Sequence, residues 1–372
     1  MSYGARALVR LDALRHNLQV IRKTAAGARV MAIVKANAYG HGLLPVAMAL
    51  TDADSFGVAR INEALALRNG GIRQPVVLLS GVYTEADLQR ALEDRIDVVV
   101  HCLPQLELLE AFTAGSLDVW LKIDTGMRRL GFLEGEAAAA LARLEQCKAV
   151  GNLRLMTHLA SADDRNSIVT RRQVQRFSAL AENFAGDISV GNSPGIFGWR
   201  DTIGEILSSH ASDQLWVRSG IALYGISPFP DGSGKDLGLA PVMQFESCLI
   251  AVKQLKTGDR VGYGGSWRAQ HDTTLGLIGA GYGDGYSRYL PAGTPVQVNG
   301  RPVPLAGVVS MDSCAVNLGP DAADRVGDPV LLWGEGLPVE EIARHAGTIP
   351  YQLVCGVTNR QPAEFIDAAG TS

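Results

Sequence analysis

The sequence has few of the features that mark exported, membrane-bound or metal-binding proteins. Its cysteines number only five, form no CxxC pair and are scattered along the chain: Cys102, Cys147, Cys248, Cys314 and Cys355. An odd number of dispersed cysteines indicates reduced thiols rather than a disulfide framework or a zinc site. We therefore predict no metal site.

Long hydrophobic runs are also missing. No window approaches the roughly 18 apolar residues of a membrane span. The first residues, MSYGARALVRLDALRHN, lack a basic segment followed by an apolar stretch, so no secretory signal is predicted. Together with the cysteine pattern, these absences predict a cytoplasmic protein.

A strong net charge is absent as well. Lysine and arginine total 34 against 38 acidic residues, which gives a net charge of −4, and only 19% of residues are charged. Such a balance provides no electrostatic reason for nucleic acid or an anionic membrane as a partner. A small molecule is the expected partner.

A glycine-rich dinucleotide loop, G-x-G-x-x-G, is absent after the first apolar run, which argues against a doubly wound open sheet. From residue 30, short apolar runs alternate with segments of helical spacing such as INEALALRNGG, TEADLQRALED and TRRQVQRFSALAENF. Such alternation predicts parallel strands covered by helices, and the count suggests a (β/α)8 barrel. The eight predicted strands are 30–35, 55–59, 75–80, 96–101, 118–124, 152–160, 187–192 and 215–225.

A segment rich in Pro, Gly, Asp and Ser, SPFPDGSGKDLGLA (227–240), predicts a linker. Beyond it the pattern is mainly β, with short strands and glycine turns over 245–255, 275–283, 295–300, 303–319 and 328–336 and one helix over 338–347. The expected domains are therefore a barrel over 1–234 and a β-rich domain over 235–372. The first ~10 residues are a candidate addition to the β-rich domain.

Lys35 ends the first predicted strand, in the sequence IVKANAYGHG. In a (β/α)8 barrel the C-terminal strand ends surround the active site. Burial lowers the pKa of a lysine and frees its amine to attack aldehydes, so Lys35 is a candidate for a Schiff base with pyridoxal phosphate. The alternative is a structural lysine whose ammonium reaches solvent.

The same strand count places two small-residue loops, GNSPG (191–195) and RSGI (218–221), after strands seven and eight. Barrel phosphate sites are frequently built from these two loops. Their backbone amides and the Ser193 hydroxyl could donate to a phosphate, although either loop alone also reads as a plain turn. Opposite a strand-end lysine, they favour a pyridoxal phosphate barrel.

The sequence VKANAYGHG resembles the cofactor-lysine motif of alanine racemases. Further segments match in the family's order: LKIDTGMRRLG, THLASADD, VRSGIALYG, VGYGGSW, GYGDGY, SMDS and PYQLVCGVTNR. The resemblance implies a barrel plus a β-domain in a head-to-tail homodimer with shared active sites. It also implies pyridoxal 5′-phosphate as cofactor and alanine as substrate, and the role is either D-alanine supply for peptidoglycan or D-alanine breakdown.

By this resemblance, Lys35 holds the cofactor and acts as one of two catalytic bases, and Tyr263 of the other subunit is the second. Inverting a stereocentre with two bases requires acid–base groups on opposite faces of a planar carbanion, and such a pair would provide them. Arg218 matches the arginine that faces the pyridine nitrogen. His158 matches the residue that supports this arginine by hydrogen bonding.

The remaining matched residues bind cofactor or substrate. Arg129 matches the arginine near the substrate carboxylate, and Lys122 matches a lysine that many members carbamylate. Met311 and Asp312 would come from the partner subunit, with the Met311 amide on the substrate carboxylate, and Tyr282 would narrow the entry channel. The phosphate-binding residues implied are Tyr39, Ser193, Gly220, Ile221 and Tyr351.

Two positions depart from the family pattern. Ser310 stands where some members have cysteine, and Arg128 replaces a small residue that often precedes the substrate arginine. Three alternative functions stay open at this point: a racemase of broader or shifted specificity, for instance toward serine, a barrel-type amino-acid decarboxylase, and a non-catalytic pyridoxal phosphate carrier.

Overall fold

The computed structural model describes residues 3–360 and 362–367, so the outermost residues of the two expected domain ranges lie outside it. Eight parallel strands close into a barrel, because β5 pairs with β6 as well as with β4. In sequence order they are β2 (Arg29–Ile33), β3 (Ser55–Val58), β4 (Val76–Leu78), β5 (Ile96–Val100), β6 (Leu117–Asp124), β8 (Val150–Met156), β9 (Ile188–Asn192) and β10 (Leu215–Ser219). The predicted (β/α)8 barrel is confirmed, and each predicted strand overlaps an observed one.

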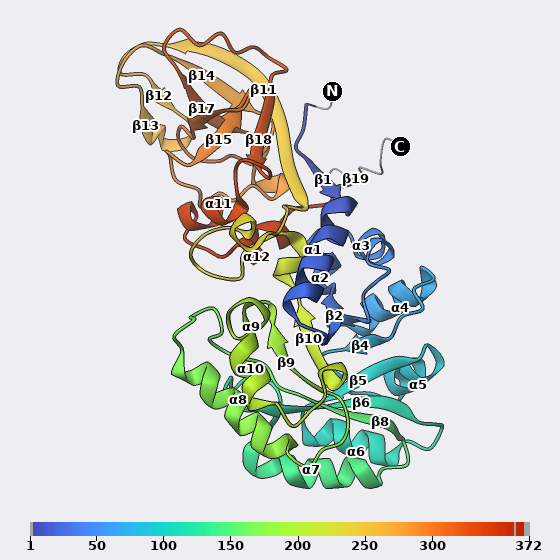
Figure 1. Ribbon diagram of the computed structural model, residues 1–372. Helices are drawn as coiled ribbons and strands as arrows, with labels where there is room; N and C mark the ends of the chain where they lie inside the picture. The colour runs from blue at the N-terminus through green and yellow to red at the C-terminus, as the bar shows by residue number, and fades with distance from the viewer. Residues whose placement is uncertain (1–2, 361, 368–372) are drawn as a thin grey trace, which may run out of the picture.

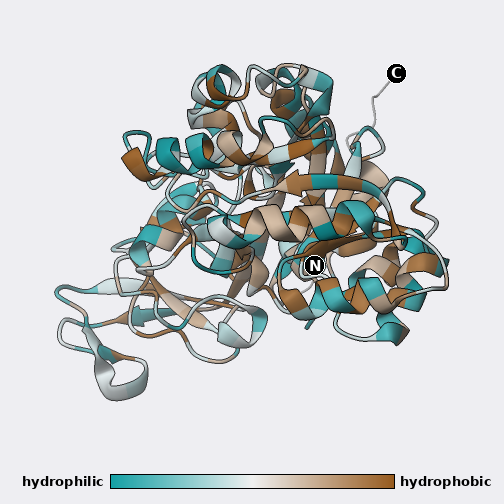
Figure 2. Ribbon diagram, turned by 90° about the horizontal axis from the view of Figure 1, so that it is seen from below, coloured by the Kyte–Doolittle hydropathy of each residue, from teal (hydrophilic) through white to brown (hydrophobic). Residues whose placement is uncertain are grey.

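Helices surround this barrel, which forms the lower part of Figure 1. Hydroxyl caps begin two of them: the Thr84 side chain accepts from the Asp87 amide at α5, and Ser167 accepts from Thr170 at α8. The helices mix hydrophilic and hydrophobic residues (Figure 2), since one face of each meets the sheet. They are α1 (Leu11–Thr24), α3 (Leu43–Ala49), α4 (Ile61–Asn69), α5 (Glu85–Glu93), α6 (Leu103–Ala111), α7 (Glu134–Gln146), α8 (Ile168–Ala181), α9 (Ser193–Gly198) and α10 (Arg200–Ile206).

The first strand of the barrel ends earlier than the sequence predicts. β2 stops at Ile33, and Lys35 is the first residue of a separate one-turn element, α2 (Lys35–Tyr39). Ala36, Asn37, Ala38 and Tyr39 all have φ of 53–54°, in the left-handed region. Asparagine tolerates this conformation, but alanine and tyrosine rarely adopt it, so residue propensities do not predict a turn of four such residues.

The C-terminal domain is a mainly β structure built on the long strand β11 (Met243–Leu255). β11 pairs with β18 (Pro329–Trp333) along one part and with β14 (Thr273–Ile278) along another. The other strands are β12 (Arg260–Val261), β13 (Trp267–Arg268), β15 (Pro295–Val298), β16 (Arg301–Pro304) and β17 (Cys314–Gly319). The apolar stretch 303–319 is thus two strands, and the loop between them carries Ser310, Met311 and Asp312.

Both ends of the described chain join this second sheet. β1 (Arg6–Arg10) pairs antiparallel with β11 and parallel with β19 (Glu364–Ile366). Two helices, α11 (Val339–His345) and α12 (Pro350–Cys355), return the chain to the barrel mouth, and α12 contacts α2. The sequence predicts α11 but not α12. Within the described residues, no helix combines the length and apolar character needed to cross a bilayer.

Candidate active site

A cavity of about 840 Å³ lies at the C-terminal ends of the barrel strands. Its lining comes from the loops after most of these strands, from the segment after β10 and from α12. Ten of the predicted site residues line it: Lys35, Tyr39, Lys122, Arg129, His158, Ser193, Arg218, Gly220, Ile221 and Tyr351. Residues far apart in the sequence therefore meet where barrel enzymes place their chemistry.

The left-handed turn of α2 explains why Lys35 and Tyr39 both reach this cavity, since they lie one turn apart. Inside the turn, the Ala38 amide donates to the Val34 carbonyl at 2.8 Å and the Gly40 amide to the Ala36 carbonyl at 3.0 Å. The His41 ring supports its end, with Nδ1 2.9 Å from the Tyr39 carbonyl oxygen. His41 is fully buried, and burial lowers its pKa to about 4, so the ring is neutral and donates from Nδ1.

Burial and the nearby Arg129 guanidinium lower the pKa of Lys35, whereas Glu63 and Cys355 act in the opposite direction. Both mechanisms disfavour the ammonium form. The neutral amine is thus more available near neutral pH than that of an exposed lysine. This is the property that Schiff-base chemistry needs.

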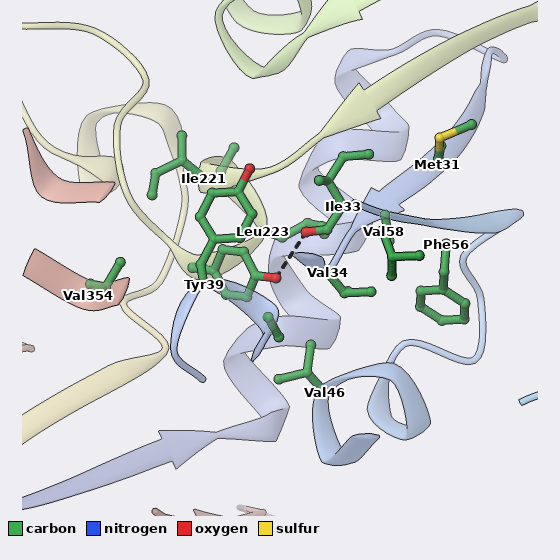
Figure 3. Close-up of a cluster of buried hydrophobic side chains, with 14 of the residues drawn as sticks. Met31, Ile33, Val34, Tyr39, Val46, Phe56, Val58, Ile221, Leu223 and Val354 are labelled. Carbon is green, nitrogen blue, oxygen red and sulfur yellow. Dashed lines mark hydrogen bonds between the residues drawn. The ribbon is translucent and has the colours of Figure 1, made fainter. Parts of the chain in front are cut away.

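Tyr39 packs among apolar side chains that include Ile221 and Val354 (Figure 3). Its ring stacks on Tyr224 with centroids 4.9 Å apart, and the Tyr224 hydroxyl donates to the Ile33 carbonyl at 3.0 Å. Tyr351 of α12 lies 6.0 Å from Tyr39, ring centroid to ring centroid. Burial raises the pKa of both Tyr39 and Tyr351, so both hydroxyls stay protonated and can donate.

Ser193 and Gly220 meet beside Tyr39. The Gly220 amide donates to Ser193 Oγ at 3.0 Å, and the Ala222 amide does so at 3.4 Å. A Cβ added at Gly220 would lie 2.5 Å from Tyr39 Oη, so only glycine leaves this space open. Two tyrosine hydroxyls, a serine hydroxyl and a bare glycine backbone form a cradle that fits a phosphate group.

Arg218 is 5% exposed and is held by four neutral acceptors. It donates to Ser189 Oγ at 2.6 Å, to the carbonyl oxygens of Thr157 and Val190, and to His158 Nδ1 at 3.3 Å. Burial lowers the pKa of Arg218 to about 10, so the guanidinium remains charged at neutral pH. Burial and the Arg218 charge hold the pKa of His158 well below its usual value, so this ring is neutral and accepts.

Lys122 of β6 is 8% exposed and lies among cations. Its pKa is lowered to about 7, first by burial and then by the charges of Arg218, Arg129 and Lys35, in that order of effect. Arg129 itself is exposed, in the loop between β6 and β7 (Phe132–Leu133). Arg128 precedes it with φ of 57°. Several like charges with only Asp124 to oppose them at Lys122 mark a site that suits an anion.

Four predicted residues lie outside this cavity, in the C-terminal domain. Tyr263 is 70% exposed in the one-turn helix η4 (Tyr263–Gly265), beside β12 at the far end of the second domain in Figure 1. Met311 is 54% exposed and Tyr282 40% exposed. The Asp312 carboxylate pairs with Arg360 at 2.7 Å. A single chain does not bring these side chains to the cavity.

Two contributors to the site do not follow from the sequence analysis. Cys355 lines the cavity, and its position one helical turn after Tyr351 on α12 is the signal that could have identified it. Glu63 of α4 accepts a hydrogen bond from the Ala36 amide, next to Lys35. The three-residue spacing from the helix start at Arg60 indicates a helix cap but not this second contact.

A barrel with a lysine turn, a phosphate cradle and a charged arginine held by neutral acceptors has the features expected of a pyridoxal phosphate enzyme. Comparison with known proteins gives the family. The N-terminal domain model of alanine racemase matches residues 9–228 and the C-terminal domain model matches residues 242–365. The chain belongs to the alanine racemase family, whose members are pyridoxal phosphate-dependent racemases.

Relatives cover the whole length of the chain. The alanine racemase of Vibrio cholerae serotype O1 is 47% identical over 367 residues, which are 98% of this chain and 99% of the relative. That of Aeromonas hydrophila subsp. hydrophila is 48% identical over 365 residues, again 98% and 99%. The crystal structure of biosynthetic alanine racemase from Pseudomonas aeruginosa superposes with a TM-score of 0.92 at 40% identity, covering 98% of this chain and 100% of that one.

Proposed function

We propose that this chain interconverts L-alanine and D-alanine, with pyridoxal 5′-phosphate as cofactor, and thereby supplies D-alanine for peptidoglycan. The observation that carries the proposal is the meeting of Lys35, Tyr39 and Arg218 in one cavity of a family member. When bound, the cofactor supplies an electron sink that acidifies the Cα–H bond of an amino acid. The residues of the chain must then bind, orient and move the proton.

Different residues of the cavity would bind different parts of the cofactor. Lys35 would hold it covalently, and Arg218 would bind its ring nitrogen, with His158 fixing the guanidinium. Because Arg218 keeps its proton, it would donate a hydrogen bond to that nitrogen without protonating it, and this would favour return of the proton to Cα. The residues that would hold its phosphate are Tyr39, Ser193, Gly220, Ile221 and Tyr351.

The second base comes from a partner. Lys35 takes or returns a proton on one face of Cα, and Tyr263 of the partner subunit serves the opposite face. Its exposure in the single chain supports this assignment, because a buried tyrosine could not enter a neighbour's cavity. Met311, Asp312 and Tyr282 are exposed as well and belong to the same C-terminal domain, with the Met311 amide and Arg129 as the groups that receive the substrate carboxylate.

The proposal extends to domain organisation and location. The barrel spans 1–234 and the partner-reaching domain 235–372, with β1 as an N-terminal strand in the second sheet. We place the enzyme in the cytoplasm, in keeping with the few, scattered cysteines of its sequence.

Loss of optical activity from L-alanine, with added pyridoxal phosphate, tests the function directly. The parent should racemise alanine, and Lys35→Ala should be slower by at least about 1,000-fold, because it lacks both the cofactor link and one base. Serine, lysine and arginine serve as competing substrates. Faster turnover of lysine than of alanine would indicate a racemase of broad specificity. Release of carbon dioxide from a diamino acid would indicate a decarboxylase instead.

A further inference from the structure

The turn that follows Lys35 needs outside support. Four consecutive residues without the freedom of glycine, Ala36 to Tyr39, adopt left-handed dihedral angles. Such a conformation persists only where surrounding contacts hold it. The contacts on this turn therefore decide where Lys35 and Tyr39 point.

Glu63 provides such a contact at the beginning of the turn. Its Oε1 accepts from the Ala36 amide at 2.7 Å, while its Oε2 accepts from the amides of Ala59 at 2.9 Å and Arg60 at 3.0 Å. The Arg60 contact is the ordinary cap of α4. The Ala36 contact crosses from the end of β3 to the end of β2, and a charged acceptor makes it a strong hydrogen bond.

A second glutamate shows what capping alone requires. Glu136 occupies the same third position of α7 and accepts from the Leu133 amide at 3.1 Å. It is exposed and lies outside the residues that line the cavity. Helix capping thus uses only one carboxylate oxygen. The second oxygen of Glu63 binds the Ala36 amide in the turn after Lys35.

The charge of Glu63 acts on the same lysine. Among the charged groups around Lys35, Glu63 raises the pKa of the amine most, with Cys355 next, whereas burial and Arg129 lower it. Lys122 adds a further cation on β6. Glu63 is therefore the carboxylate that most offsets the cationic surroundings of Lys35, and it also binds the backbone amide of the next residue.

We infer that Glu63 is a positioning residue for catalysis: its carboxylate ties the backbone amide after Lys35 to the start of α4 and so fixes the left-handed turn that presents Lys35 and Tyr39. The inference rests on the proposed function for its kinetic consequence. It concerns a contact within the chain, so it also has a readout that needs no turnover.

The first experiment measures amide hydrogen exchange in the cofactor-loaded full-length protein and in the variants Glu63→Gln, Glu63→Asp and Glu136→Gln. The Glu63→Gln change replaces one acceptor oxygen by an NH₂ group, which cannot accept from an amide, and the Glu63→Asp side chain is one methylene too short to span both elements. Both Glu63 variants should exchange the amides of residues 36–41 at least about tenfold faster than the parent. Glu136→Gln should leave this segment at the parent rate.

The second experiment measures kcat and KM for alanine in the same proteins. Displacement of a proton-transferring group typically costs up to about 100-fold, so kcat should fall about 10- to 100-fold in both Glu63 variants with a smaller change in KM. Glu136→Gln should retain the parent kcat. If only one Glu63 variant folds, that variant still carries both measurements.

Parent-like exchange and kcat in both Glu63 variants would overturn the inference. Faster exchange of residues 36–41 and a lower kcat in Glu136→Gln would also overturn it, because loss of a helix cap alone would then explain the effects of the Glu63 variants. A parent protein that does not racemise alanine would contradict the proposed function, while the exchange rates would still decide whether Glu63 holds the turn.

Discussion

At the scale of single residues, Lys122 makes the sharpest chemical prediction. Burial and the charges of Arg218, Arg129 and Lys35 lower the pKa of this amine to about 7. Carbon dioxide reacts only with a neutral amine: a C–N bond forms, a proton leaves and an anionic carbamate results. Carbamylation would convert Lys122 from a cation among three others into an anion that can pair with Arg129.

The pH dependence follows from the same pKa. Above pH 7 most of the Lys122 amine is neutral and carbamate should accumulate, whereas below pH 7 protonation should deplete it. Carbon-13 NMR of the protein with labelled bicarbonate at pH 6, 7 and 8 checks this rise, and Lys122→Gln should remove the signal. A parent spectrum identical to that of Lys122→Gln at pH 8 would show an unmodified lysine.

The sequence predicts the residues of the cavity better than those outside it. Lys35 and Ser193 follow the strands β2 and β9, and Arg218 is the second-last residue of β10, so a strand count alone places all three at the same barrel mouth. Tyr263 and Met311 have no such signal, because the contact expected of them lies between two chains. Glu63 is missed for another reason: sequence spacing indicates its helix cap but not a contact with a different element.

At the scale of elements, the left-handed turn α2 is the feature least accessible to sequence analysis. A left-handed helical residue other than glycine or asparagine costs roughly 1–2 kcal/mol, so Ala36, Ala38 and Tyr39 together cost about 3–6 kcal/mol that neighbouring contacts must offset. In KANAY only Asn37 has a preference for the left-handed region, and the lysine and two alanines around it favour an ordinary right-handed helix. The eight barrel strands were predictable because helices cover them, which leaves near-continuous apolar runs.

The opposite end of the barrel depends on one arginine shared among strands. Arg154 of β8 pairs with Asp97 of β5 at 3.2 Å, with Asp118 of β6 at 3.1 Å and with Asp187, before β9, at 3.4 Å. Its side chain is 18% exposed. Burial and the Asp118 charge raise the pKa of Asp97 to about 7, an effect that Arg154 opposes.

Arg154→Met should destabilise the protein by about 3 kcal/mol, because three carboxylates lose their shared cation. The thermal midpoint should fall by about 5–10 °C. Asp97 binds its proton more tightly in the folded than in the unfolded state. Protonation at low pH removes part of the unpaired charge, so the loss of stability in Arg154→Met should be smaller at pH 5.5 than at pH 8. The exposed pair Arg143–Glu110, at 2.6 Å, is the matched control: Arg143→Met should cost at most about 1 kcal/mol. Equal midpoints for the two variants would contradict a special role for Arg154.

At the scale of the whole molecule, the proposed shared site predicts complementation between inactive subunits. Lys35→Ala and Tyr263→Phe proteins should each be inactive. In a mixed dimer one cavity regains both bases, and the other has neither.

Random exchange of subunits makes half the dimers mixed, so recovered activity should approach about a quarter of the parent value. Activity is measured after the two variants are unfolded and refolded together, with mixed dimers quantified by a tag on one subunit. Mixed dimers without activity would show that each site is built within one chain.

The joining of β1 to the second sheet has a consequence for synthesis. β1 begins at Arg6, but its partner β11 begins only at Met243. At roughly 5–20 residues per second, a ribosome makes the second strand on the order of 10 to 50 seconds after the first. The barrel can close in that interval, while β1 still lacks its partner β11. β1 can therefore pair with β11 only after translation has passed the barrel and reached the domain that carries Tyr263.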